Sequence, residues 1–285
     1  MSTGLYVVRA GSLTTLQDRG RPGLAHLGVP RAGALDRPAA DLANRLVGNG
    51  HDAAVLEVTL GGLEVRATSS CWVAVTGAAG EVTVDGEARG HARAEFVPGG
   101  ATLRLGVPAT GVRSYVAVAG GIAAEPVLGS RATDTLAWVG PPRVVDGTEL
   151  AVGDPTGAPV AHDTPRPPRP GPLRLDAGPR DDWFAPDALG LLCGTTYTVA
   201  VESNRIGLRL RGAPLARVRT GELPSEGMVL GAVQVPPSGQ PVVFLADHPA
   251  TGGYPVIGVV RSEDLWQCAQ LRPGDEVRFS RPGRR

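Results

Sequence analysis

Lysine is absent from this sequence, and every basic side chain is an arginine. A Walker A loop places a lysine at the nucleotide phosphates, a Schiff-base enzyme needs an amine nucleophile, and a biotin carrier needs a lysine to modify. The chain therefore excludes all three of these mechanisms as its own.

An excess of charge of either sign is also absent, because the 28 basic residues balance 28 acidic ones. A general nucleic-acid binder needs a basic surface that displaces counterions from phosphates, so nucleic acid is not an expected partner. The three cysteines, Cys71, Cys193 and Cys268, show no CxxC spacing, and the five histidines show no ligand spacing. We expect neither a disulfide framework nor a metal site.

Long apolar runs are lacking as well. No stretch approaches the ~20 apolar residues that cross a bilayer, and the first residues do not resemble a secretory signal. We therefore expect a cytoplasmic protein that has no membrane partner.

Glycine and proline are abundant, with 40 and 26 residues in a chain of 285. This composition favours many turns and a mainly β fold with a few short helices. One clear amphipathic helix is predicted over residues 35–50. Asp36 can cap its start, Pro38 suits its first turn, and Gly48 can end it in the left-handed conformation.

Alternating apolar residues predict strands elsewhere, at 54–60, 72–77, 114–121, 196–203 and 241–247. Asp-Gly pairs in "TVDGEA" and "VVDGTEL" predict two hairpins. The segment 154–172 is dominated by proline and predicts an extended connector. We expect a β-rich domain at 1–153 and a second β-barrel domain at 173–285.

Polar groups gather among glycines in the stretch "LQDRGRPG" at 16–23 and in "LGSRATD" at 128–134. The first stretch predicts either a ligand site or an exposed turn with a surface ion pair between Asp18 and Arg21. The second predicts either an anion seat at Gly129 and Arg131 or an ordinary loop capped by Ser130 and Asp134.

The stretch 226–255 combines carboxamides, a carboxylate, glycines and a phenol. The short connection "VPPSGQP" predicts a hairpin that brings Gln234 near Asp247. Such groups suit recognition of a small amide or lactam, which needs one acceptor and one donor. The alternative is a structural polar network at a sheet edge.

These stretches, in this order, carry a resemblance to a known family. The motifs are "TLQDRGRPG", "GVPRAGALDRPAADLANRLVGN", "LEVTLGG", "SYVAVAGGI", "LGSRATD", "NRIGLRLRG", "ELPSEGMVLGAVQVPPSGQP" and "DHPATGGYP". The sequence resembles the family variously called allophanate hydrolase subunit 2, biotin-dependent carboxyltransferase family protein or the C subunit of 5-oxoprolinase. The resemblance extends over nearly the whole chain.

The resemblance implies cyclophilin-like β-barrel domains and membership of a complex that opens 5-oxoproline to L-glutamate with ATP shared among subunits. Its implied partners are an allophanate hydrolase subunit 1-type protein (the B subunit of 5-oxoprolinase) and a lactam-utilisation protein (the A subunit of 5-oxoprolinase). One alternative is a carboxyltransferase that acts with carboxybiotin on a urea-like or amide substrate, with biotin carried by another chain. Another is a regulatory protein that binds a kinase-inhibitor partner.

With that resemblance, the polar stretches become a hypothetical cleft for a small lactam or urea-like compound. Asp18, Asp247 and Tyr254 are the candidates for orientation or proton transfer. The candidate substrate-binding residues are Gln17, Arg21, Asn44, Asn49, Glu57, Arg131, Asn204, Arg205, Gln234, Gln240, Thr251, Gly252 and Gly253. Among them, Arg21, Arg131 and Arg205 are the candidates for a carboxylate or phosphate.

Overall fold

The computed structural model describes residues 4–160, 169–219, 221 and 223–281. The chain divides into two compact units, of which unit 1 comprises residues 1–21, 32–134 and 138–167. Unit 2 comprises residues 22–31, 135–137 and 168–285. Two short segments from the first half of the sequence thus belong to unit 2. The predicted connector includes residues 161–168, which lie outside the described residues, and the predicted boundary stays a prediction.

Unit 1 consists of two antiparallel sheets. The first has the strand order β11-β1-β4-β9-β6-β7 and the second the order β2-β3-β10-β5-β8. Buried side chains from both sheets, such as Val7, Val65, Leu56 and Val116, form one hydrophobic core. The strands are β1 (Gly4–Ala10), β2 (Leu13–Gln17), β3 (Val55–Thr59), β4 (Leu63–Ala67), β5 (Cys71–Gly77), β6 (Val82–Val84), β7 (Glu87–Ala88), β8 (Ala94–Val97), β9 (Thr102–Leu105), β10 (Arg113–Val118) and β11 (Glu149–Ala151).

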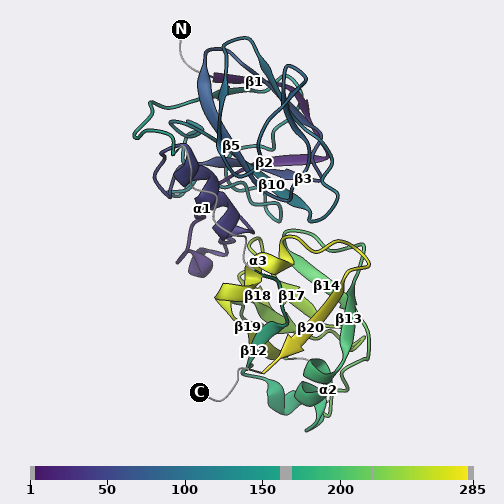
Figure 1. The fold of residues 1–285 in the computed structure, drawn as a ribbon. Helices are drawn as coiled ribbons and strands as arrows, with labels where there is room; N and C mark the ends of the chain where they lie inside the picture. Colours follow the sequence, from purple (N-terminus) through teal and green to yellow (C-terminus); the bar gives the residue numbers. More distant parts are fainter. Residues whose placement is uncertain (1–3, 161–168, 220, 222, 282–285) are drawn as a thin grey trace. The chain divides into compact units, whose positions relative to one another are not determined.

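The predicted helix of unit 1 is confirmed as α1 (Arg37–Leu46). The Asp36 carboxylate caps it by accepting a hydrogen bond from Ala39 N at 3.0 Å, and Gly48 follows its end with φ +76°. Ala43 and Leu46 pack against the second sheet, so the helix covers β5 and β10 (Figure 1). This packing brings the start of α1 close to polar groups on that sheet.

Unit 2 is a closed barrel with the strand order β12-β19-β16-β17-β14-β13-β20 (Figure 1). The mainly β fold with a barrel, predicted from the sequence, is confirmed. A separate two-stranded sheet joins β15 to β18. The strands are β12 (Leu173–Ala177), β13 (Thr196–Val199), β14 (Gly207–Arg211), β15 (Glu226–Gly227), β16 (Ala232–Gln234), β17 (Val242–Phe244), β18 (Thr251–Gly252), β19 (Val256–Val260) and β20 (Glu276–Ser280). The short helices are η1 (Ala25–Leu27), η2 (Asp181–Trp183), α2 (Ala188–Gly194), η3 (Ser262–Asp264) and α3 (Leu265–Cys268).

One of the two Asp-Gly hairpins is confirmed. Asp85 and Gly86 both have positive φ and connect β6 to β7, which pair antiparallel. The hairpin predicted in "VVDGTEL" is wrong. A turn does form there, with Thr148 N donating to Val145 O at 3.1 Å, but β11 pairs with β1 and not with the segment before the turn. The Asp-Gly signal specifies a turn and leaves open which strand lies beside it.

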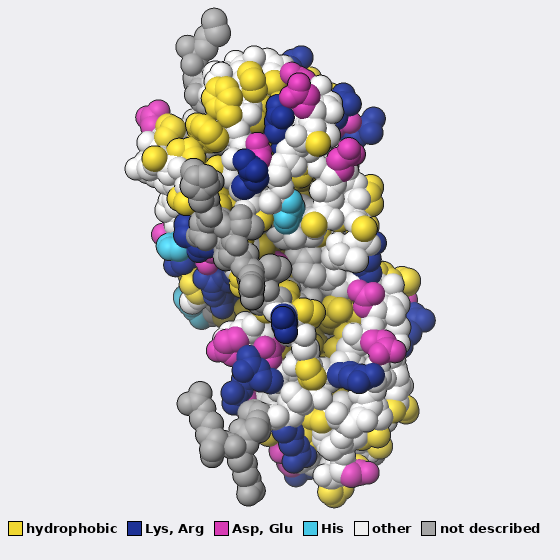
Figure 2. All heavy atoms as spheres, in the orientation of Figure 1, with side chains coloured by type: hydrophobic (Ala, Val, Ile, Leu, Met, Phe, Trp, Pro, Cys, Tyr) yellow, Lys and Arg dark blue, Asp and Glu magenta, His cyan; other side chains and the backbone are white. Residues whose placement is uncertain are grey.

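The surface carries charges of both signs. On the face shown in Figure 2, basic and acidic side chains are interspersed, in keeping with the balanced composition. In the part of the chain that the structure describes, no helix has the length and apolar character needed to cross a bilayer.

Candidate functional site

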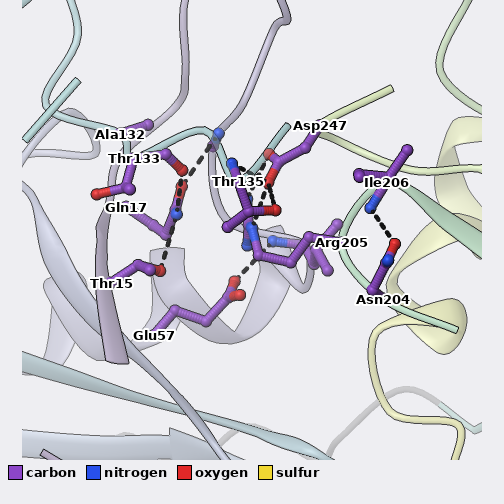
Figure 3. A network of polar contacts seen from close by, with 12 residues as sticks. Thr15, Gln17, Glu57, Ala132, Thr133, Thr135, Asn204, Arg205, Ile206 and Asp247 are labelled. Atoms are coloured by element: carbon purple, nitrogen blue, oxygen red, sulfur yellow. Dashed lines mark hydrogen bonds and ion pairs between the residues drawn. The ribbon is translucent and has the colours of Figure 1, made fainter. Parts of the chain in front are cut away.

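Gln17, at the end of β2, is fully buried in unit 1 and its carboxamide is occupied by the protein itself. Its Nε2 donates to Thr133 O at 2.8 Å and to Thr15 Oγ1 at 3.0 Å (Figure 3). Its Oε1 accepts a hydrogen bond from Gly33 N at 3.1 Å. The side chain therefore connects three backbone segments.

Asp18 holds the loop at 128–134. Its carboxylate accepts hydrogen bonds from Gly20 N at 2.7 Å and from Ser130 Oγ and Arg131 N, each at 2.6 Å. Ser130 Oγ also accepts from Ala132 N at 3.0 Å, as the ordinary loop interpretation of "LGSRATD" predicts. With three donors around it, the Asp18 carboxylate has a structural task.

Arg21 is only 3% exposed, so the alternative of an exposed turn with a surface ion pair is wrong for this residue. Its guanidinium donates to the carbonyl oxygens of Ala132 at 2.5 Å and of Val127 at 3.3 Å. Arg131 directs Nε to Ala124 O at 2.7 Å. Both side chains satisfy backbone acceptors that a loop would otherwise leave without partners.

Asn44 and Asn49 connect the end of α1 to β10. Asn44 Nδ2 donates to Ala53 O at 2.8 Å, and Asn49 Nδ2 donates to Val118 O at 2.8 Å. Gly120 N donates to Asn49 Oδ1 at 2.8 Å. The two carboxamides also bond to each other at 3.1 Å, so they work as one connection.

Glu57 of β3 is 1% exposed and lies beside the start of α1. Its Oε2 accepts hydrogen bonds from Leu35 N at 3.0 Å and Tyr115 Oη at 2.8 Å, and its Oε1 lies 3.4 Å from Arg113 Nε. Burial, with the Glu57 charge beside it, raises the pKa of Tyr115 well above its usual value. The sequence did not identify Tyr115, because the phenol comes from a strand far along the chain.

Asp247 lies in unit 2 and is completely buried. It accepts hydrogen bonds from Arg205 Nε at 2.8 Å and Nη2 at 2.9 Å, and from Thr135 N at 2.9 Å and Oγ1 at 2.7 Å (Figure 3). The two threonine donors attach the segment 135–137 to the barrel, and the forked arginine contact holds the carboxylate that accepts them. Thr135 was not predicted, and no local signal marks it.

Asn204 and Gln240 stabilise turns of unit 2. Asn204 Oδ1 accepts from Ile206 N at 2.8 Å and Gly207 N at 3.2 Å, which is an Asx turn leading into β14 (Figure 3). Gln240 bonds to Gly212 twice, accepting from its N–H at 2.8 Å and donating to its carbonyl oxygen at 3.2 Å. Both side chains make hydrogen bonds to backbone groups of these turns.

Gln234 lies at the turn end of the β16–β17 hairpin, opposite Val242. Asp247 follows the far end of β17, so the expectation that this hairpin brings Gln234 near Asp247 is wrong. Gln234 Nε2 donates instead to Tyr254 O at 3.0 Å. Of the three groups expected to converge, only Gln234 and Tyr254 are in contact.

Several accessible members of the predicted set lie on the segment that holds β18. Thr251 and Gly253 are exposed, Gly252 is half-buried, and Tyr254 is 44% exposed. The guanidinium carbon of Arg217 lies 5.5 Å from the centre of the Tyr254 ring. Arg217 was missed, because "ARVR" in the sequence does not distinguish it from its neighbours.

Within each unit, the predicted site residues lie in several clusters, and the single cleft predicted from the sequence stays a prediction. No three His, Cys, Asp or Glu side chains of the described residues come together as metal ligands.

The comparisons with known proteins establish the family. The model of the carboxyltransferase domain, subdomain A and B, matches residues 27–281. The chain belongs to this carboxyltransferase family. It is similar to the C subunit of 5-oxoprolinase from Escherichia coli (strain K12), with 37% identity over 279 residues that cover 96% of this chain and 90% of that protein. It is also similar to urea amidolyase of Saccharomyces cerevisiae, with 31% identity over 97% of this chain but 16% of that protein.

Solved structures agree with this membership of the carboxyltransferase family. TTHA0988 superposes with a TM-score of 0.88 at 38% identity over 98% of this chain. The Kluyveromyces lactis urea carboxylase superposes with a TM-score of 0.90 at 27% identity over 97% of this chain. The chain spans 55% of the TTHA0988 chain and 27% of the urea carboxylase chain.

Proposed function

We propose that this carboxyltransferase-family chain is the C subunit of a 5-oxoprolinase complex, which opens the lactam of 5-oxoproline to L-glutamate with hydrolysis of ATP. The similarity to the Escherichia coli C subunit carries the proposal, because it extends over nine-tenths of that protein. The C subunit of 5-oxoprolinase from Haemophilus influenzae supports it, with 32% identity over 94% of this chain and 88% of that protein.

The complex would contain partners that correspond to the A and B subunits of 5-oxoprolinase. In the larger relatives, the matched domain occupies only a part of a longer chain. That a domain of this family occurs as part of longer chains supports a role for this chain beside further subunits. Because this chain has no lysine for a Walker A loop, we propose that ATP is bound together with the partner subunits.

The second candidate function is a carboxyltransferase that acts with carboxybiotin on a urea-like or amide substrate. The similarity to the Saccharomyces cerevisiae urea amidolyase favours it. Biotin would arrive on another chain, since no lysine is present to carry it. The regulatory alternative and the cytoplasmic location stay predictions.

Reconstitution tests the proposal. The purified chain would be combined with the two partner subunits, and L-glutamate and ADP would be measured with 5-oxoproline as substrate. We expect both products in a one-to-one ratio from the complete mixture, and none when any one component is left out. A parallel mixture with a biotin carboxylase, a biotinylated carrier and urea tests the second function. Turnover there, without turnover of 5-oxoproline, would overturn the first proposal.

A further inference from the structure

The arginines around the barrel of unit 2 usually face a carboxylate of the same unit. Arg180 pairs with Glu226, Arg205 pairs with Asp247 at 2.8 Å, and Arg219 pairs with Asp182 at 2.5 Å. Desolvation of a cation on folding costs free energy unless a nearby anion compensates for the lost hydration. The ion pairs of unit 2 follow this rule.

Arg217 departs from it. The side chain is half-buried, and burial lowers the pKa of its guanidinium. Its Nη2 donates to Val235 O. Within the described ranges, no carboxylate lies at ion-pair distance from Arg217, and its buried Nε has no hydrogen-bond partner. Because Nε is closed to solvent, an anion from outside would reach the guanidinium through its outer nitrogens. A partly desolvated cation that faces no carboxylate of its own unit is the arrangement expected of a residue whose anion comes from outside.

Tyr254 lies against this guanidinium, and its backbone is held in place. The Arg217 Cζ atom is 5.5 Å from the centre of the ring, and Gln234 donates to Tyr254 O at 3.0 Å. A Cβ on Gly252 would come within 2.8 Å of Gln234 Nε2 and 3.2 Å of Met228 Sδ, so glycine leaves room for these two side chains. The surface therefore presents a guanidinium, a phenol and a glycine-containing backbone segment next to one another.

These observations favour a small carboxylate as the ligand. An arginine fork matches the two oxygens of a carboxylate, and the hydrogen bonds are charge-assisted. 5-Oxoproline has one carboxylate, next to the nitrogen of its lactam ring. We propose that Arg217, with Tyr254 beside it, binds the carboxylate of 5-oxoproline. This inference rests on the proposed function and adds a specificity-determining residue to it.

A matched pair of ligands and a matched pair of variants test the inference. 2-Pyrrolidinone has the same lactam ring as 5-oxoproline but no carboxylate. Arg219→Gln is the control for Arg217→Gln, because both residues lie in one segment and Arg219 has Asp182 as its partner. Arg217→Lys keeps the charge but removes the fork, and provides a second variant if Arg217→Gln is poorly folded.

Calorimetric titration of the full chain with its partner subunits measures binding of each ligand. We expect Arg217→Gln to weaken binding of 5-oxoproline by about ten- to a hundred-fold, because one charge-assisted contact is lost. Binding of 2-pyrrolidinone should change little, and Arg219→Gln should behave as the wild type with both ligands. In turnover, the Arg217 variants should raise KM and leave kcat nearly unchanged.

Unchanged binding of 5-oxoproline in both Arg217 variants would overturn the inference, and so would a wild type that does not bind 5-oxoproline. Glu222 is a carboxylate outside the described residues. If Glu222→Gln weakens binding of 5-oxoproline as much as Arg217→Gln does, the anion that pairs with Arg217 comes from this chain, and the inference is also overturned. If the wild type binds 5-oxoproline through Arg217 but does not turn it over, only the proposed function fails. If it turns 5-oxoproline over with the same KM in both variants, only the inference fails.

Discussion

Asp247→Asn should destabilise unit 2 strongly. Asp247 is completely buried, with Arg205 bound to both of its oxygens and Thr135 bound through N and Oγ1. Asparagine keeps the shape but removes the charge and replaces one acceptor with a donor. Breaking a buried ion pair by changing one partner costs about 3–5 kcal/mol. At roughly 2–4 °C per kcal/mol for a chain of this size, Tm should fall by about 6–20 °C.

Thermal unfolding and the activity of the surviving folded complex should be measured on one preparation. The control is Asp176→Asn, because Asp176 and Arg261 form an ion pair on the surface and its loss should move Tm little. We expect Asp247→Asn to lower Tm while the folded fraction keeps its kcat/KM. A normal Tm with lost activity would refute this reasoning and would support the catalytic role predicted for Asp247 from the sequence.

Three further predictions concern buried groups. Glu57→Gln removes the charge beside Arg113 and weakens the contacts with Leu35 N and Tyr115, so it should lower the free energy of unfolding by about 3–5 kcal/mol in urea titrations. If Glu57 binds substrate instead, turnover should fall without that loss of stability. Burial raises the pKa of the Cys71 thiol to about 11, so iodoacetamide at pH 8 should label Cys71 only after the chain unfolds. Peptide mass spectrometry measures the labelling, and rapid labelling of the native chain would contradict this. Burial lowers the pKa of His248, so below about pH 6.5 the unfolded chain binds a proton at this residue more readily than the folded chain does. As the pH is lowered through this range, the free energy of unfolding should therefore decrease more in the wild type than in His248→Gln. Urea titrations that show the same decrease in both proteins would contradict this.

Local signals in the sequence were sufficient where the interacting residues are close in the chain. The Asp36 cap bonds three residues ahead, and the β6–β7 hairpin closes over Asp85 and Gly86. The contacts that hold distant segments together were not predictable in this way. Asp247 and Thr135 are 112 residues apart, and Glu57 and Tyr115 are 58 apart. Such pairs depend on how the strands and loops are arranged in space, and no local sequence pattern specifies that arrangement.

Polar residues that gather among glycines also have a structural role in this fold, for a physical reason. A mainly β chain with many loops has numerous backbone N–H and C=O groups outside its sheets, and each needs a partner when it is buried. Gln17, Asp18, Arg21 and Asn49 provide those partners. These side chains stabilise the fold through the hydrogen bonds described, and their role in binding a lactam or a carboxylate stays a prediction.

A different guide is a partly buried charge that the described fold leaves without an opposite charge. Arg217 meets this criterion, since no carboxylate of the described part of the chain lies at ion-pair distance and burial lowers the pKa of its guanidinium. Asp247 is the opposite case, because four donor contacts converge on its two oxygens. If the Arg217 variants change binding of 5-oxoproline and Asp247→Asn changes only stability, the absence of an opposite charge will have separated a binding residue from a structural one within a single unit.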